Sequence, residues 1–363
     1  MKAIILVGGE GTRLRPLTCN TPKTMVPVLD MPFLEYVIRR LKEHRIEVIT
    51  LAISHLAGPI ADYFGDGSRF GVRLNYPREE ARLGTAGAVK NAREHLDETF
   101  LVLNGDVFTD LDFTAMLNFH REREARVTIA LTPVDDPTHY GLIETDARGR
   151  VTRFLEKPDW SEVTTNMINA GTYVMEPEIL DGIPPQTNFS FENELFPRLL
   201  KDGEPVYAYP STGYWIDIGT PNKYLCLHYD LLGGRAGQHA FDRGDEVIVG
   251  ERSFIDPSAR ITGPVLVGSA CTIGRKVRLT GPVVIGSGSE IGPGAVIEGA
   301  VLWGDVQVGE GAVVKDSVIA SNCRIGAGSA VTDGSVLGDN VTVTAGCKLA
   351  PASQVWPGKV AGD

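Results

Sequence analysis

A six-residue periodicity in the last third of the chain most constrains its fold. Aliphatic residues recur every sixth position from Ile255 to Ile297, and after a slip in register the repeat resumes from Ile325 to Leu349. Glycine often follows the aliphatic residue, and small residues fill the position four later. Such hexads are typical of a parallel β-helix, where aliphatic side chains stack inside a triangular prism, and three hexads per coil predict about five coils.

The cysteines fit this pattern and bear on the compartment. Cys271, Cys323 and Cys347 fall at the small, inward position of their hexads, so we expect core residues rather than metal ligands. The five cysteines show no CxxC spacing, and the N-terminus is too short in apolar residues for a signal peptide. An odd number of cysteines with no pairing signature predicts a reducing, cytoplasmic location.

The chain before residue 233 alternates two kinds of segment. Short apolar runs at 3–7, 47–53, 72–76, 99–106 and 126–134 predict strands, and residues 33–44, 87–96 and 113–124 predict helices. We expect an α/β fold, a Rossmann-like mixed, mostly parallel sheet with helices on both faces. The Gly-rich residues 233–246 predict a linker between a domain at 1–232 and a β-helix domain at 247–363.

Charge and hydropathy exclude two classes of partner. The net charge is −11, so the overall field does not favour nucleic acid. No run approaches the roughly 20 apolar residues that span a bilayer, so we expect no membrane partner. An anionic ligand would need a local cluster of cations, backbone N–H groups or a metal.

The sequence GGEGTR, which follows the first predicted strand, is a candidate for that cluster. It is not a P-loop, because no GK[ST] follows, and Leu14 stands where a dinucleotide fingerprint needs its third glycine. A tight turn of Gly8, Gly9 and Gly11 can bring backbone N–H groups close to a polyphosphate. Arg13 and Lys23 would add positive charge; an ordinary glycine turn with surface cations is the alternative.

The wider stretch GGEGTRLRPLTCNTPKTMVPV resembles the signature of the sugar-nucleotide pyrophosphorylases, which join a nucleoside triphosphate to a sugar 1-phosphate. The motifs LGTAGA, NGD, YG, EKP, NAG and YWIDIGTP follow in the family's order. The resemblance implies an enzyme with the nucleotidyltransferase fold and small-molecule substrates, and similarity to hexapeptide proteins implies a left-handed β-helix. A non-catalytic NDP-sugar-binding regulatory subunit is the alternative of another class.

The resemblance also implies roles for individual residues. The expected catalytic residues are Arg13, Lys23, Asp106, Lys157 and Asp217. The expected nucleotide-binding residues are Gly8, Gly9, Gly11, Thr12, Arg13, Lys23, Gly84 and Gly87. The expected sugar-phosphate residues are Gly141, Glu156, Lys157 and Asn169. Nucleotidyl transfer joins two polyanions without a general base, so we expect Mg²⁺, held by Asp106 and Asp217.

Substrate specificity is less constrained. The LGTAGA loop, the segment NFSFENELFP and the hexapeptide tail look most like mannose-1-phosphate guanylyltransferases, which implies GTP and mannose 1-phosphate. Glucose-1-phosphate enzymes that use dTTP or UTP share nearly all of these features and are the alternative. Glu79 and Glu80 could accept hydrogen bonds from guanine, and Arg82 could contact base or phosphate, although exposed side chains are the simpler reading.

The β-helix has no histidine for acyl transfer, so we assign it another role. We expect apolar residues such as Trp303 and Val318 to be exposed on it and to drive homo-oligomer formation. Deletion from about residue 247 onward would then yield a smaller particle.

Overall fold

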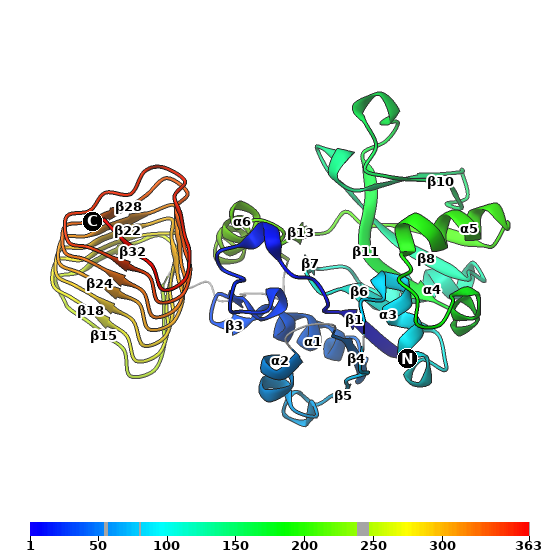
Figure 1. Ribbon diagram of the computed structural model, residues 1–363, viewed down its shortest axis with the longest axis horizontal. Helices are drawn as coiled ribbons and strands as arrows, with labels where there is room; N and C mark the ends of the chain where they lie inside the picture. The colour runs from blue at the N-terminus through cyan, green and yellow to red at the C-terminus, as the bar shows by residue number, and fades with distance from the viewer. Residues whose placement is uncertain (54–56, 80, 238–246, 363) are drawn as a thin grey trace. The chain divides into compact units, whose positions relative to one another are not determined.

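The computed structural model describes residues 1–53, 57–79, 81–237 and 247–362, which form two compact units. The α/β unit comprises Met1–Gly9 with Leu34–Trp215, and the β-helix unit comprises Glu10–Phe33 with Ile216–Asp363 (Figure 1). Neither unit is one continuous stretch of chain. The loop after the first strand is divided between them.

The α/β unit is built on a nine-stranded sheet in the order β10-β9-β11-β6-β1-β4-β5, with β8 beside β11 and β12 beside β8. Its strands are β1 (Lys2–Leu6), β4 (Val48–Ala52), β5 (Arg73–Asn75), β6 (Phe100–Asn104), β8 (Val127–Pro133), β9 (Gly141–Thr145), β10 (Val151–Glu156), β11 (Met167–Met175) and β12 (Val206–Pro210). Its helices are α1 (Phe33–Glu43), α2 (Ala57–Phe64), α3 (Gly84–Asn91), α4 (Phe113–Glu122) and α5 (Phe196–Lys201). Two further strands are β7 (Val107–Thr109) and β13 (Trp215–Asp217).

The sheet is mixed, as predicted. β1 runs parallel to β4 and β6, while β11 runs antiparallel to β6, β8 and β9. Leu6 pairs with both Ala52 and Asn104, so the carboxyl ends of β1 and β6 lie side by side. In such sheets ligands sit beyond these strand ends. The glycine loop follows β1 and the turn with Asp106 follows β6, so both leave the sheet at this edge.

Apolar burial fixes the strands and the helices that cover them. Ile4, Val102 and Tyr173 from neighbouring strands join Ala86 and Val89 of α3 in one buried cluster. Among the described residues, no helix is long and apolar enough to cross a membrane.

The predicted β-helix is present, with three parallel sheets. The first contains β14 (Val247–Val249), β17 (Val265–Val267), β20 (Val283–Ile285), β23 (Val301–Leu302), β26 (Val318–Ile319), β29 (Val336–Leu337) and β31 (Gln354–Val355). The second contains β15 (Phe254–Ile255), β18 (Thr272–Ile273), β21 (Glu290–Ile291), β24 (Gln307–Val308), β27 (Arg324–Ile325), β30 (Thr342–Val343) and β32 (Val360–Ala361). The third contains β16 (Arg260–Thr262), β19 (Arg278–Thr280), β22 (Val296–Glu298), β25 (Val313–Lys315) and β28 (Ala330–Val331).

The described sheets hold up to seven strands each, more than the five coils predicted. The extra coils lie at the ends, where the hexad pattern weakens, as at Ala361. Inside the prism, Cys271 and Cys323 are buried and Cys347 packs on the same core, which confirms the prediction for these residues.

Two shortened corners explain the slip in the hexad register. Most coils advance by 18 residues, as from Val265 to Val283, but Val284 pairs with Val301 and Val301 with Val318, a step of 17 each. The shortening falls at Gly299 and Asp316, both of which have positive φ. The Tyr229 hydroxyl donates to the carbonyl oxygen of Gly299. Helix α6 (Pro221–Leu232), which carries Tyr229, thus rests against this corner.

The outer face of the first sheet is apolar and is covered by the same unit. The indole N–H of Trp303 donates to Tyr224 of α6 at 2.9 Å, and the Asn20 amide donates to Asp339 at 3.2 Å. Trp303 is only 4% exposed and Val318 only 2%. The prediction that these two residues are exposed was wrong, and Trp303 is buried where it meets Tyr224 of α6.

Candidate active site

The glycine turn is shaped by contacts inside the β-helix unit. Gly11 has a φ of 61°, which favours glycine, and it precedes the short 3-10 turn Thr12–Leu14. The Thr18 hydroxyl donates to the Gly11 carbonyl oxygen at 2.7 Å. A Cβ on Gly11 would lie 3.2 Å from the Cβ of Lys23. The turn therefore packs against the base of the Lys23 side chain, and the phosphate-binding role of Lys23 stays a prediction.

Arg13 lies beside Asp217 in this unit, at Gly219 of the YWIDIGTP motif. A Cβ on Gly219 would lie 2.7 Å from a carboxylate oxygen of Asp217 and 3.2 Å from a guanidinium nitrogen of Arg13. Asp217 is 8% exposed and forms an ion pair with Lys223. The structure thus brings Arg13 and Asp217 together, and adds a second cation.

Lys223 was missed by the sequence analysis, although a signal for it exists. Thr220 caps α6, and its hydroxyl oxygen accepts from the Lys223 backbone N–H. With Pro221 at the first turn, this cap places Lys223 on the helix turn nearest Asp217. Arg13 and Lys223 therefore both lie near the Asp217 carboxylate.

Asp106 lies in the α/β unit, just after β6, as predicted. The backbone N–H of Gly105 donates to the Leu6 carbonyl oxygen at 3.0 Å, which holds this turn against the end of β1. Gly8 and Gly9 follow the end of β1, so the turn that carries Asp106 lies beside the first residues of the glycine loop. Asp106 and Asp217 belong to different units, and their shared metal site stays a prediction.

The carboxylates of Asp106 and Asp217 can be compared with the ligands that Mg²⁺ prefers. Among the described residues, no group of three or more His, Cys, Asp or Glu side chains could hold a metal ion. Two carboxylates suit a Mg²⁺ that keeps waters and phosphate oxygens as its remaining ligands. The Asp106 and Asp217 carboxylates are the candidates for this role, and Asp217 would share its charge with Lys223.

The predicted sugar-side residues gather within the α/β unit. Glu156 ends β10 beside Gly141, and a Cβ on Gly141 would lie 3.0 Å from a Glu156 carboxylate oxygen. The Lys157 ammonium lies 3.6 Å from the Glu156 carboxylate, and its backbone N–H donates to the Tyr140 carbonyl oxygen. Lys157 is exposed and has a φ of 49°, a strained conformation for a lysine.

Asn169 is held at an irregularity in β11. The β11–β8 register shifts between Asn169 and Tyr173, and the Asn169 amide donates to the Tyr173 hydroxyl at 2.8 Å. Its carbonyl oxygen accepts from the backbone N–H of Gly171 at 3.0 Å. Both ends of the amide are thus fixed. Such bulges often aim a side chain at a site.

Glu192 is a second acidic residue near this cluster that the sequence analysis did not select. It lies on the π-helical turn Phe191–Leu195, and its carboxylate accepts from Ser190 at 2.7 Å and from Thr85 at 3.2 Å. Burial, together with the nearby Glu192 charge, raises the pKa of Glu156 above its ordinary value, against the opposing effect of Lys157. Two carboxylates near one another suit a polyhydroxyl ligand.

Gly84 and Gly87 have a structural reason to be glycine. A Cβ on Gly84 would lie 2.5 Å from the Asn188 side-chain oxygen, and one on Gly87 would lie 2.4 Å from the Thr187 carbonyl oxygen. The start of α3 therefore packs closely on residues 187–189. Contact between these glycines and a nucleobase stays a prediction.

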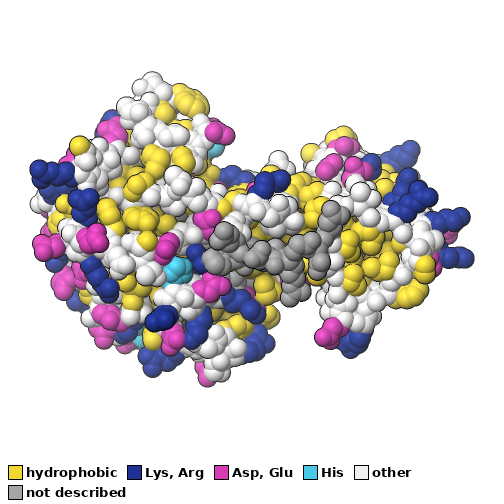
Figure 2. All heavy atoms as spheres, turned by 180° about the vertical axis from the view of Figure 1, so that it is seen from behind, with side chains coloured by type: hydrophobic (Ala, Val, Ile, Leu, Met, Phe, Trp, Pro, Cys, Tyr) yellow, Lys and Arg dark blue, Asp and Glu magenta, His cyan; other side chains and the backbone are white. Residues whose placement is uncertain are grey.

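The residues before this loop are only partly described. Arg82 is exposed, and Glu79 is half-buried with its pKa raised by burial. Glu80 lies outside the described residues. On the face that Figure 2 shows, acidic and basic side chains are interspersed over the α/β unit, while Lys and Arg side chains gather at one edge of the β-helix unit.

A mixed α/β sheet with a glycine loop at its strand ends, followed by a parallel β-helix, defines a nucleotide-binding enzyme with a solenoid tail. Residues 2–233 match the family model described as nucleotidyl transferase, and residues 245–349 match the EIF2B subunit epsilon LbH domain. The chain belongs to the nucleotidyl transferase family. The predicted reaction class and the left-handed β-helix are confirmed.

Individual relatives span much of the chain. It is 40% identical over 265 residues to the mannose-1-phosphate guanylyltransferase of Mycobacterium tuberculosis, covering 72% of this chain and 73% of the relative. It is 40% identical over 238 residues to a UTP–glucose-1-phosphate uridylyltransferase of Synechocystis, covering 62% and 61%. The crystal structure of HddC from Yersinia pseudotuberculosis matches with a TM-score of 0.55 and 30% identity, over 62% of this chain and 97% of HddC. Enzymes of this family generally use a divalent metal.

The predicted domain limits at 232 and 247 stay predictions. Residues 238–246 of the predicted linker lie outside the described residues.

Proposed function

We propose that the protein joins GTP and mannose 1-phosphate to form GDP-mannose and pyrophosphate. The observation that carries this proposal is the cluster of Arg13, Asp217 and Lys223 at Gly219, a charge arrangement suited to a polyphosphate. The similarity to the mycobacterial guanylyltransferase supports the choice of substrates. A structure of HddC in complex with GMP-PN supports a guanine nucleotide.

The reaction needs no proton transfer. A phosphate oxygen of the sugar forms a bond to the α-phosphorus, and the bond from that phosphorus to the bridging oxygen breaks. The electron pair leaves with pyrophosphate. Arg13 and Lys23 stabilise charge on the phosphates, while Lys157 holds the sugar phosphate beside Glu156. Mg²⁺, held through Asp106 and Asp217, would supply further charge stabilisation at the α-phosphate.

Asn169 and Glu192 would complete the sugar site. The fixed Asn169 amide and the two acidic side chains, Glu156 and Glu192, can accept hydrogen bonds from sugar hydroxyls. Glu79, a half-buried carboxylate before the α3 glycines, would accept from the guanine N1–H and N2–H₂. Uracil has no such pair of donors.

The experiment is to measure pyrophosphate release with Mg²⁺ for GTP, ATP, dTTP, UTP and CTP, each with mannose 1-phosphate and glucose 1-phosphate. We expect turnover with GTP and mannose 1-phosphate. Turnover only with UTP or dTTP and glucose 1-phosphate would replace this specificity with that of the uridylyl- or thymidylyltransferases. Binding of an NDP-sugar with no turnover in any pair would favour a regulatory subunit.

We further propose that the enzyme self-associates through the β-helix and acts in the cytoplasm. Phe254, Trp356 and Val360 are exposed apolar residues of the β-helix, and all five cysteines are free. Truncation at residue 247 is a poor test of association, because it would uncover α6 and residues 10–33. Surface variants of the whole chain are better suited.

A further inference from the structure

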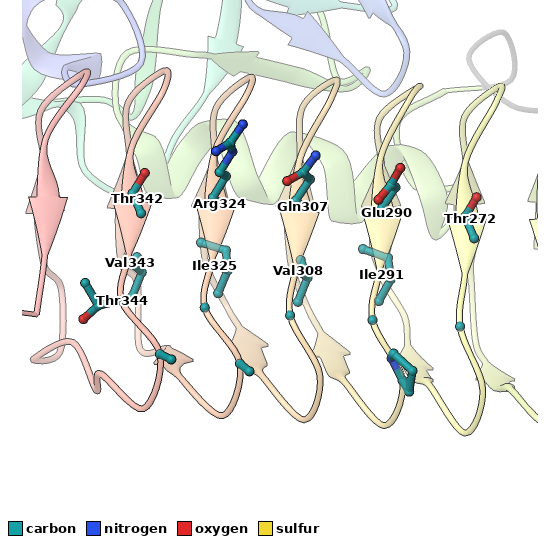
Figure 3. Close-up of a pocket in the computed structure, with 17 residues that line it drawn as sticks. Thr272, Glu290, Ile291, Gln307, Val308, Arg324, Ile325, Thr342, Val343 and Thr344 are labelled. Carbon is teal, nitrogen blue, oxygen red and sulfur yellow. The ribbon is translucent and has the colours of Figure 1, made fainter.

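One row of side chains runs along the outer face of the second β-helix sheet. In the register of the strands the row is Phe254, Thr272, Glu290, Gln307, Arg324, Thr342 and Val360. Figure 3 shows the five central members along successive strands. At about 4.8 Å per strand, six steps give a row roughly 29 Å long.

The chemistry of the row is symmetric about Gln307. One strand away on either side are Glu290 and Arg324, which carry opposite charges. Next come Thr272 and Thr342, and the two ends are apolar: Phe254 is 58% exposed and Val360 is 59% exposed. Two copies of this row that run in opposite directions would therefore match acid with base, threonine with threonine and apolar end with apolar end.

The two charged members have no ion-pair partner in the part of the chain that the structure describes. Glu298 and Lys315 on the third sheet form an ion pair at 2.8 Å. Glu290 and Arg324 form no ion pair with any described residue, and both are exposed. Gln307, which lies between them, separates their charges.

A shallow groove of about 630 Å³ runs beside the row (Figure 3). The groove is lined by four glycines, Gly274, Gly292, Gly309 and Gly326. A Cβ at any of them would collide with the next coil, which explains why these positions are glycine. For Gly292 the contact would be 2.8 Å from the Val308 carbonyl oxygen. This part of the groove is therefore lined by backbone rather than by side chains.

We propose that this face binds a second copy of the same chain about a two-fold axis. The axis lies between the second sheets of the two copies, at the level of Gln307. It runs at right angles to the direction in which the coils stack. Glu290 then pairs with Arg324 of the partner twice, each Thr272 meets a Thr342, and each Phe254 meets a Val360. The inference rests on the proposed self-association and specifies its surface.

The charges select this axis over its alternative. A two-fold axis parallel to the row would place Glu290 on Glu290 and Arg324 on Arg324, which is repulsive. Isologous pairing requires that residue i contacts j and j contacts i. Complementary charges fix orientation and register more than affinity, which the apolar ends and close backbone approach would supply.

The test is the mass of the full-length chain by light scattering and sedimentation over a range of concentrations. We expect Glu290→Arg and Arg324→Glu each to raise the dimer dissociation constant at least about tenfold, because two attractive pairs become repulsive. The double variant Glu290→Arg/Arg324→Glu should return it to near the wild-type value. An equimolar mixture of the two single variants should also associate.

The matched control is Glu298→Lys/Lys315→Glu, a reversal on another face, which should leave the mass unchanged. Circular dichroism would verify that each variant is folded. A wild-type chain that stays monomeric would overturn both the self-association and this surface. An oligomer that tolerates the single reversals, or a double variant as weak as the singles, would overturn only the surface.

Discussion

The indole N–H of Trp303 donates to the phenol oxygen of Tyr224 across 2.9 Å, and the Tyr224 hydroxyl donates onward to the Pro27 carbonyl oxygen. Trp303 belongs to the β-helix, whereas Pro27 belongs to the signature segment that carries Arg13 and Lys23. Tyr224 is fully buried and Trp303 is 4% exposed. A buried chain of hydrogen bonds therefore ties the signature segment to the solenoid.

Removing these two hydrogen bonds should lower the free energy of unfolding, and the effects of the two variants should not be additive. Trp303→Phe and Tyr224→Phe should each cost about 1–3 kcal/mol, because the first removes the indole donor and leaves unfilled space in a buried site, and the second leaves the buried indole N–H without its acceptor. The double variant should cost less than the sum, with a coupling of about 1 kcal/mol in a urea-denaturation cycle. Trp356→Phe, at a residue 47% exposed, is the control and should change stability by less than about 0.5 kcal/mol. Strict additivity would argue against a shared network.

Lys157→Gly should separate stability from activity. Its φ of 49° is strained for lysine and free of strain for glycine, so stability should rise by up to about 1 kcal/mol. The loss of a charge at the sugar phosphate should lower kcat/KM about 100-fold. Arg45→Gly, at an exposed residue with a φ of 60°, should raise the melting temperature similarly and leave kinetics unchanged. Full activity in Lys157→Gly would remove Lys157 from the site.

Lys223→Met should change the nucleotide and metal requirements in opposite directions. Loss of a cation from the phosphate cluster should raise the KM for GTP about tenfold. Release of Asp217 from its ion pair should lower the Mg²⁺ concentration that gives half-maximal rate. Lys315→Met breaks an ion pair on the β-helix instead and should do neither. An unchanged Mg²⁺ dependence would count against Asp217 as a metal ligand.

Glu192→Gln should shift the acid limb of the pH profile. Burial and the Glu192 charge raise the pKa of Glu156, so removing that charge should lower it. If ionised Glu156 binds the sugar, kcat/KM for sugar phosphate should then persist to lower pH. Glu194→Gln, an exposed carboxylate on the same turn, is the control. A shift of the limb to higher pH would contradict the assignment.

Local sequence patterns predicted the parts of this fold that depend on local rules. The hexads identified Ile273 and Ile297 as inward residues because the coil repeats every three hexads, and both are buried. The apolar run before GGEGTR identified β1 for a similar reason. The pattern could not reveal that Trp303 is covered, since its partner Tyr224 lies 79 residues away.

The candidate site shows the same limit. Lys223 follows a capping threonine and could have been selected from that signal. Glu192 could not, because its place near Glu156 depends on a π-helical turn and on packing between segments distant in sequence. The sequence also could not show that Gly84 and Gly87 pack against residues 187–189, because these segments are distant in the chain, and the contact of the two glycines with a nucleobase stays a prediction.

The packing of residues 10–33 on the β-helix has a consequence for biosynthesis. The Asn20 amide donates to Asp339, a residue 319 positions later. The signature segment is therefore synthesised early but can complete its packing only after residues near 339 have been synthesised. Limited proteolysis of ribosome-bound chains should therefore cut this segment until residues near 339 have emerged, whereas early protection would refute this order. Because domains otherwise fold from the N-terminus during synthesis, we expect a nascent chain of this enzyme to stay inactive until its solenoid is nearly complete.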